Sequence, residues 1–167
     1  VLAPAHDLAA CTHAWAGGIV RATREGDRIA YYGRGRDGKT QIFIIPSDGS
    51  DRAADPAKRP VQVTQFPRGV ESGLRWHPGG DYVAAISNNG VAVTCVKPGA
   101  CFGETRFVTP QGGSSPRTNL VWSPDGATLA YNKAVRTRDA DGRRARNYDG
   151  SDCLQILVAE FREEVFE

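Results

Sequence analysis

The stretch that decides the fold runs from residue 120 to residue 131 and reads Leu-Val-Trp-Ser-Pro-Asp-Gly-Ala-Thr-Leu-Ala-Tyr. Its centre, Pro124-Asp125-Gly126, is a turn sequence, because proline presets φ and glycine accepts a positive φ. Apolar residues stand on both sides of this turn. The stretch therefore predicts a strand, a tight turn and a second strand.

Two earlier segments can be aligned with this one. Residues 74–85 read Leu-Arg-Trp-His-Pro-Gly-Gly-Asp-Tyr-Val-Ala-Ala, and residues 19–31 read Ile-Val-Arg-Ala-Thr-Arg-Glu-Gly-Asp-Arg-Ile-Ala-Tyr. The turn glycines are Gly26, Gly80 and Gly126, at intervals of 54 and 46 residues. Self-similarity at such a period indicates a chain built from repeated structural units.

Further strands are predicted after each hairpin. The third strand of each unit is expected at residues 40–45, 90–96 and 153–159. The second of these alternates, which places Val91, Val93 and Cys95 on one face, whereas the other two are continuously apolar and predict strands covered on both faces. A short fourth strand is expected at residues 61–64 and 106–109, and the third unit has none before its end.

Four antiparallel strands repeating at this spacing are typical of a β-propeller blade. One twisted sheet cannot bury both of its apolar faces, whereas sheets packed radially cover one another. In this arrangement Trp76 and Trp122 lie on innermost strands and wedge between adjacent blades. A two-sheet sandwich gives no reason for the same tryptophan, turn and strand to recur. We predict an all-β fold, a partial β-propeller of about three four-stranded antiparallel blades.

The predicted blades span residues 19–68, 69–112 and 113–167, after an N-terminal edge segment at residues 1–18. Known propellers close with at least about four blades, so three units leave open apolar faces. We expect the chain to be part of a larger propeller. The alternatives are self-association of two copies, or packing of the open faces against a partner protein.

Composition excludes several classes of protein. Hydrophobic residues make up 40% and charged residues 24% of the 167 residues, which are ordinary values for a folded domain. The most apolar segments are about five residues long, too short for a transmembrane segment. A net charge of +2 is too small to imply general nucleic-acid binding. Scattered histidines, and cysteines without the spacing of a zinc site, predict no metal.

The four cysteines allow two disulfides. Cys95 and Cys101 flank the turn-forming sequence Val-Lys-Pro-Gly-Ala, which would bring their Cα atoms within disulfide range. Cys11 and Cys153 would then form a second bridge tying the two ends of the chain together. The alternative is four buried free thiols. Disulfides would indicate an oxidising compartment.

Arginines supply the candidate binding site. In a propeller, the loop between the second and third strands emerges on the same face as the loops that join blades. The predicted basic rim on that face comprises Arg34, Arg36, Arg68, Arg117, Arg136, Arg138, Arg143, Arg144 and Arg146, with Lys39 beside them. Such a rim suits an acidic protein surface or another polyanion. The alternative is a solvated loop whose charge is neutralised by Asp139, Asp141, Asp149 and Asp152.

No catalytic arrangement is visible in the sequence. The phrases Gly-x-Ser-x-Gly and His-Glu-x-x-His are absent. His77 occupies the turn position where Ser123 stands in the third unit, so it is predicted to be an exposed turn residue. We expect no enzymatic activity and no cofactor.

The segment at residues 120–131 resembles the repeat of TolB-like β-propellers, in which Trp-Ser-Pro-Asp-Gly precedes a small apolar strand. Val63-Thr64 and Val108-Thr109 resemble the phrase that opens the outer strand in those proteins. Residues 13–161 are similar to the C-terminal half of a family of uncharacterised bacterial TolB-like proteins thought to be extracytoplasmic. The second copy of the phrase has His77 and Gly79 in place of Ser and Asp, and the first lacks Trp and Pro.

The resemblance implies a periplasmic or secreted, non-enzymatic scaffold that binds a protein partner through its propeller loops. No specific nucleic acid is implied as a partner. Two alternatives stay open. The chain is an accessory propeller of a prolyl-oligopeptidase-like hydrolase, which predicts a downstream Gly-x-Ser-x-Gly domain, or a polysaccharide-active propeller, which predicts His and carboxylate side chains along the central channel.

Overall fold

The computed structural model of the chain describes residues 20–49, 59–112, 119–134, 141–143 and 154–166. Within them the chain forms eleven strands in three antiparallel sheets, and one short 3-10 helix at Glu163–Phe166. Strands that neighbour in sequence also neighbour in each sheet. The predicted all-β class is confirmed, because helix is limited to a single turn of these residues.

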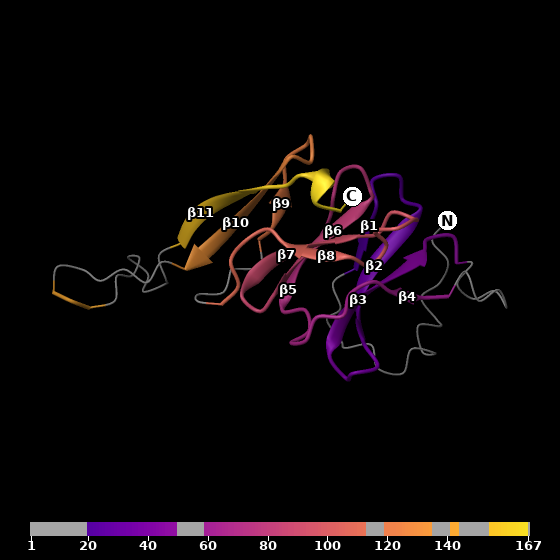
Figure 1. Cartoon of the computed structure of the whole chain (residues 1–167), viewed down its shortest axis with the longest axis horizontal. Helices are drawn as coiled ribbons and strands as arrows, with labels where there is room; N and C mark the ends of the chain where they lie inside the picture. Colours follow the sequence, from indigo (N-terminus) through magenta and orange to yellow (C-terminus); the bar gives the residue numbers. More distant parts are fainter. Residues whose placement is uncertain (1–19, 50–58, 113–118, 135–140, 144–153, 167) are drawn as a thin grey trace.

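The three sheets are called here blade 1, blade 2 and blade 3, in chain order. Blade 1 contains β1 (Val20–Ala22), β2 (Arg28–Arg34), β3 (Thr40–Pro46) and β4 (Val61–Gln62). Blade 2 contains β5 (Ser72–Trp76), β6 (Tyr82–Ser87), β7 (Gly90–Cys95) and β8 (Thr105–Phe107). Blade 3 contains β9 (Val121–Trp122), β10 (Thr128–Ala134) and β11 (Leu154–Glu160). The three sheets lie one after another and do not close into a ring (Figure 1).

The first hairpin of every blade has the same turn. In each turn the glycine amide donates to the carbonyl three residues earlier, at Gly26, Gly80 and Gly126. These glycines have φ of 75°, 79° and 77°, values that favour glycine because they lie in the left-handed region. The aligned phrases therefore correspond to one repeated local structure.

Two hydrophobic cores hold the stack together, one at each junction between blades. On β7, Val91, Val93 and Cys95 pack in the core shared with blade 3, as the alternation predicts. Ala92, on the opposite face of the same strand, packs in the core shared with blade 1. Every residue of β6 and β7 is consequently buried. Blade 2 is the layer on which both of its neighbours pack.

The predicted tryptophan wedges are confirmed. Trp122, on β9, is 9% exposed and lies in the core between blades 2 and 3. Trp76, on β5, is half-buried against the core between blades 1 and 2. The guanidinium of Arg28 lies 5.2 Å from the centre of the Trp76 ring, close enough for a cation–π contact. Arg28 also donates to the carbonyls of Gly80 (2.8 Å) and Val96 (3.3 Å), so this blade 1 side chain binds the blade 2 turn.

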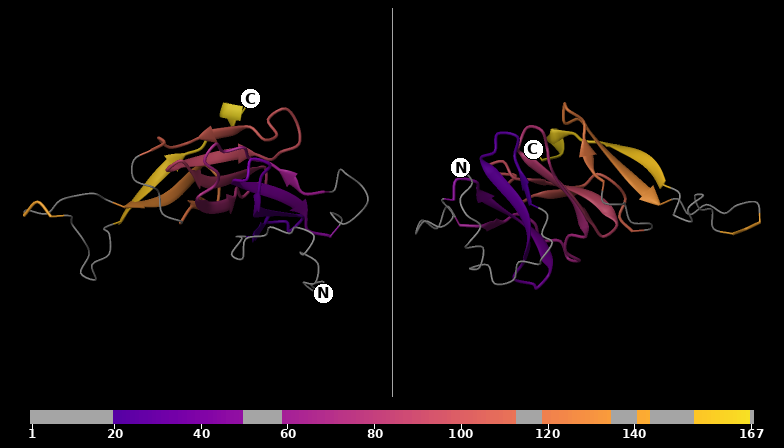
Figure 2. Two further views of the ribbon diagram at one scale, coloured as in Figure 1. Left: turned by 90° about the horizontal axis from the view of Figure 1, so that it is seen from below. Right: turned by 180° about the vertical axis from the view of Figure 1, so that it is seen from behind.

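The prediction that the third strand of the third unit is covered on both faces is wrong for the described residues. Ile156 and Val158 of β11 are 77% and 64% exposed. They lie on the face of blade 3 opposite to Leu129, which packs in the core shared with blade 2. No described sheet packs on that side of the blade 3 ribbon in Figure 2. The alternating strand β7 is the one buried on both faces. Burial therefore follows a strand's position in the stack more closely than its own composition.

A disulfide joins Cys95, the last residue of β7, to Cys101, with their Cα atoms 5.8 Å apart. This is the bond that the turn sequence between them predicts. Cys11, Cys153 and the predicted edge segment at residues 1–18 lie outside the described residues. In the described part of the chain, no helix has the length and apolar character needed to cross a membrane.

Candidate functional site

Two loops of blade 1 are fastened together at one end of the sheet. One joins β2 to β3, and the other leads from blade 1 to blade 2. The Val70 amide donates to the Thr40 carbonyl (2.7 Å), and the Lys39 ammonium donates to the Pro67 carbonyl. The second-to-third-strand loop and the blade-joining loop therefore share one face, as the propeller topology predicts.

Buried Gln41 fixes this pair of loops. Its side-chain nitrogen donates to the Phe66 carbonyl (3.0 Å), and its side-chain oxygen accepts from the Phe66 amide (3.0 Å) and the Thr64 hydroxyl (2.9 Å). The Gln41 side chain is fully buried. Sequence reasoning missed this positioning residue, although a glutamine at the start of an otherwise apolar strand was a usable signal.

Blade 2 repeats the arrangement with a tighter turn. The Gly112 amide donates to the Asn88 carbonyl (2.9 Å), and the Ser87 hydroxyl donates to the Gly69 carbonyl (2.7 Å). Asn88 and Asn89 have positive φ of 48° and 59°, as a two-residue hairpin turn requires. We call the continuous surface formed by residues 34–40, 66–71, 87–90 and 109–112 the loop face.

The loop face presents four cations: Arg34, Arg36, Lys39 and Arg68, all exposed. The two carboxylates on the same face are engaged by loop backbone. Asp37 accepts from the Lys39 amide (3.0 Å), and Glu71 accepts from the Asn89 amide (3.1 Å). The loops that carry Arg34, Arg36 and Arg68 are thus brought together by backbone contacts.

The remaining predicted rim residues are not joined to this face by the described structure. Arg143 lies in a described segment of three residues, 141–143. The others lie outside the described residues: Arg117, Arg136, Arg138, Arg144 and Arg146.

His77 is buried, so its prediction as an exposed turn residue is wrong: it is 8% exposed. At the same turn position in blade 3, the Ser123 hydroxyl accepts from the Thr128 amide, five residues further on (3.0 Å). The Nδ1 atom of His77 accepts instead from the Gly79 amide, two residues further on (3.0 Å). Because imidazole is longer than a hydroxyl, its ring extends into the next blade and lies 4.9 Å from the Trp122 ring and 5.6 Å from the Phe161 ring.

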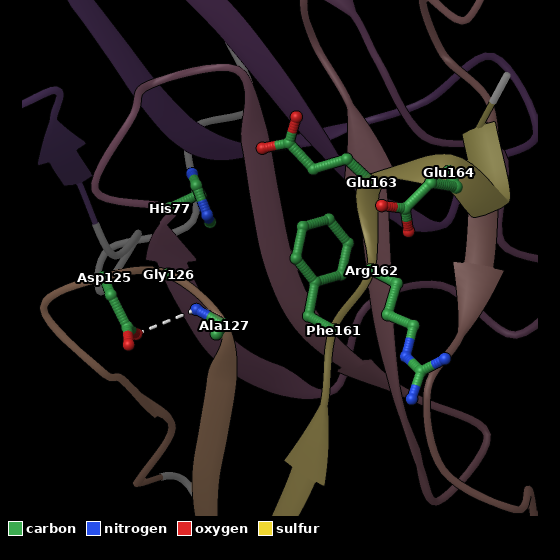
Figure 3. Close-up of a pocket in the computed structure, with 8 residues that line it drawn as sticks. All are labelled: His77, Asp125, Gly126, Ala127, Phe161, Arg162, Glu163 and Glu164. Carbon is green, nitrogen blue, oxygen red and sulfur yellow. Dashed lines mark hydrogen bonds between the residues drawn. The ribbon is translucent and has the colours of Figure 1, made fainter.

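A cavity of about 570 Å³ opens beside His77, between the blade 3 turn and the C-terminal 3-10 helix (Figure 3). It is lined by His77, Asp125, Gly126, Ala127, Phe161, Arg162, Glu163 and Glu164. Hydrogen bonds from the Ser123 hydroxyl and the Ala127 amide lower the pKa of Asp125, which keeps this carboxylate charged as a turn cap. Among the described residues, no cluster of three or more His, Cys, Asp or Glu side chains is placed to hold a metal ion.

Comparison with known proteins identifies the fold. No family model matches the chain. The chain superposes on the putative TolB from Agrobacterium tumefaciens with a TM-score of 0.54, over 87% of this chain and 47% of that one, at 16% identity. TolB from Acinetobacter baumannii gives a TM-score of 0.50 over 87% of this chain and 32% of that one, at 18% identity. The chain has a TolB-like β-propeller fold.

Other proteins share the TolB-like fold with this chain. An oligogalacturonate lyase in complex with manganese has a TM-score of 0.59, at 15% identity over 87% of this chain and 36% of that one. Pyrococcus horikoshii acylaminoacyl peptidase has a TM-score of 0.53, at 15% identity over 87% of this chain and 23% of that one. Because proteins named for different activities share this fold, the TolB-like fold alone does not indicate which function this chain has.

Sequence comparison finds a curated relative of this chain. It is the uncharacterized protein YidR of Escherichia coli (strain K12), which is 28% identical over 113 residues. The match covers 67% of this chain and 24% of YidR. The chain thus spans about a quarter of YidR, and less than half of each of the four TolB-like structures above.

His77 makes the stability of these TolB-like blades depend on pH. Burial lowers the pKa of His77 below its usual value of 6.5, and the nearby Glu163 carboxylate only partly opposes this. The unfolded chain therefore binds more protons than the folded chain just below pH 6.5. The neutral His77 ring makes its full contribution to the free energy of unfolding above this pH. That contribution is lost as the pH falls through the lowered pKa.

We expect the urea midpoint to fall between about pH 7.5 and about pH 5.5. The control is His77→Ser, which keeps an acceptor in the turn as Ser123 does and should lose this pH dependence. Asp27 and Asp125 do not contribute to this change of the urea midpoint, because their pKa values are lowered from 3.8 and both stay charged over this pH range. If the urea midpoint falls equally in the wild type and in His77→Ser, the pH dependence does not come from His77.

Proposed function

We propose that this protein is a non-enzymatic interaction scaffold of the TolB-like propeller type, and that its loop face binds an acidic surface of a protein partner. The observation that carries the proposal is the presentation of Arg34, Arg36 and Arg68 on loops fastened by buried Gln41. Loops held by a rigid scaffold are the usual position of binding residues in folded domains.

Arginine chemistry favours carboxylates as the bound groups. The guanidinium is planar, permanently charged, and suited to paired hydrogen bonds with a carboxylate. Within the residue ranges of the loop face the four cations, Arg34, Arg36, Lys39 and Arg68, outnumber the two carboxylates, Asp37 and Glu71. A protein partner is favoured over single-stranded nucleic acid because Phe66, the aromatic residue of the loop face, is buried and offers no stacking platform.

We infer an extracytoplasmic location, periplasmic or secreted, for this scaffold. The Cys95–Cys101 disulfide supports this inference, because disulfides persist in oxidising compartments.

The test is native mass spectrometry of the protein isolated from its own cells, with and without reductant. We expect a protein partner at fixed stoichiometry, and a mass increase of about 2 Da on reduction of one disulfide. With the purified partner, Arg34→Glu/Arg36→Glu/Arg68→Glu is expected to weaken binding at least about tenfold at low salt, and less at high salt.

The matched control carries the same charge change off the loop face. Arg24, Arg59 and Arg162 are also exposed, so Arg24→Glu/Arg59→Glu/Arg162→Glu should bind the partner nearly as well as the wild type. If both triple variants lose affinity equally, or neither does at any salt concentration, the loop face is not the binding surface.

A further inference from the structure

A second cavity, of about 590 Å³, lies between the outer strands of blades 1 and 2 and shares no lining residue with the cavity beside His77. We call it the side cavity. Blade 1 contributes Gln62 of β4 to it, and the segment after β4 contributes Gln65 and Pro67. Blade 2 contributes Phe102 and Phe107. A cavity of this volume can receive the side chains of a bound peptide.

Phe102 is an aromatic side chain that a rigid loop holds beside the side cavity. Its ring is 43% exposed. The loop between β7 and β8 is closed by the Cys95–Cys101 disulfide, and the Gly103 amide donates to the Cys95 carbonyl (2.9 Å). The Glu104 amide also donates to the Cys101 carbonyl (2.8 Å). Because the loop is held in this way, Phe102 stays exposed in the free protein and loses little conformational freedom when a ligand covers it.

β8 is the edge strand of blade 2, and part of its backbone faces outward. The Glu104 carbonyl accepts from the last amide of β7, and the Val108 amide donates to a carbonyl of the same strand (2.9 Å each). These bonds alternate along an antiparallel strand. The amide and carbonyl groups of Thr105 and Phe107 are therefore directed away from β7, toward no strand of the described residues.

The edge of β4, which borders the side cavity from blade 1, is closed by its own side chain. The Val63 amide donates to the Ile42 carbonyl of β3 (2.9 Å), so the backbone groups of Gln62 and Thr64 face outward. The side-chain nitrogen of Gln62 donates to the Thr64 carbonyl (2.7 Å) and occupies this edge. Of the two outer strands, β8 is therefore the one whose edge is open to a further strand.

The lining of the side cavity matches an uncharged occupant. The rings of Phe66 and Phe107 lie 6.1 Å apart in it, and no ionisable side chain is among the described residues that line it. On β8, Arg106 pairs with Glu104 and donates to the Val165 carbonyl of the C-terminal 3-10 helix (3.4 Å). A charged group in the side cavity would lose its hydration without gaining a partner of opposite charge.

We propose that the side cavity is a second binding site, where a short uncharged segment of a partner protein adds to the edge of β8 as a further strand. Alternate side chains of an added strand point to one face of the sheet, so those on the side of blade 1 enter the cavity beside Phe102. Main-chain hydrogen bonds to Thr105 and Phe107 supply affinity, and the cavity supplies specificity. An oligosaccharide could contact the rings but could not pair with the strand.

The experiment selects peptides of about ten residues from a phage-displayed library on the full chain and measures their affinity by calorimetry. We expect the selected peptides to share uncharged apolar residues at alternate positions. Phe102→Ala should weaken their binding at least about tenfold. N-methylation of the peptide amides that face β8 should abolish binding, whereas N-methylation of the intervening amides should be tolerated.

Val165→Ala is the matched control, because Val165 is 47% exposed and does not line the side cavity. It should bind the selected peptides as well as the wild type does. Phe102→Ala should keep the urea midpoint of the wild type within about 0.3 M, since its side chain is exposed, and a weakened affinity then reports a lost contact rather than unfolding.

Three results would overturn the proposal: no enriched peptide, equal affinity of Phe102→Ala and the wild type, or binding that survives both patterns of N-methylation. An array of neutral oligosaccharides is probed in parallel, and we expect no binding to it. Oligosaccharide binding that Phe102→Ala abolishes would assign the side cavity to a sugar, and would also overturn the proposal.

Discussion

Trp122→Ala is expected to lower the free energy of unfolding by about 3–5 kcal/mol, the range for a buried aromatic truncated to alanine. Trp122 is 9% exposed, and its ring lies 4.9 Å from His77 and 5.2 Å from Phe161. The variant removes the side chain that fills the junction between blades 2 and 3. Urea unfolding followed by circular dichroism measures the loss.

Two comparison variants show that the loss comes from packing. The indole nitrogen of Trp122 is buried and has no hydrogen-bond partner among the described residues, so Trp122→Phe should cost much less than alanine. Trp76→Ala should also cost less, because Trp76 is only half-buried. If Trp122→Phe is as damaging as Trp122→Ala, the junction is not maintained by ring packing.

Gly126→Ala is expected to destabilise the fold by about 2–5 kcal/mol, from strain at positive φ together with overpacking. Gly126 has φ of +77°, and a Cβ atom there would overlap the imidazole of His77. Gly26 is the matched control, since its φ is +75° and a Cβ atom would meet nothing within 4 Å. Gly26→Ala should therefore show the strain alone, about 1–2 kcal/mol.

A double-mutant cycle separates the two contributions to the Gly126 effect. His77→Ser removes the ring that the new methyl group would strike. In that background, Gly126→Ala should cost no more than Gly26→Ala, which gives a coupling energy of about 1–3 kcal/mol between residues 77 and 126. Additive losses would mean that the blade 2 turn shifts freely to accommodate the methyl group.

The repeated phrase allowed the strands and the tryptophan junctions to be predicted from sequence. Turn glycines and alternating strands are local signals, and blade stacking follows from the need to bury both faces of a sheet. The burial of His77 could not be predicted from these local signals. Its turn position resembles that of Ser123, but the contacts of its ring depend on where the next blade packs.

The candidate site, too, could be predicted from the sequence only in part. The topology predicted that Arg34, Arg36 and Arg68 would lie on loops of one face. It did not predict that Gln41 fastens those loops, because this needs three hydrogen bonds to residues more than twenty positions away. The exposure of Ile156 also could not be predicted from the sequence, because an apolar strand has the same composition whether or not a neighbouring sheet covers it.

The alanine found at the same place in all three sheets bears on how a chain of this kind lengthens. Ala30, Ala84 and Ala130 each stand four residues after the turn glycine, and each pairs with a branched residue of the third strand, namely Ile44, Val93 and Val158. Duplication of a single unit would therefore carry this alanine pairing into the same place of the new sheet.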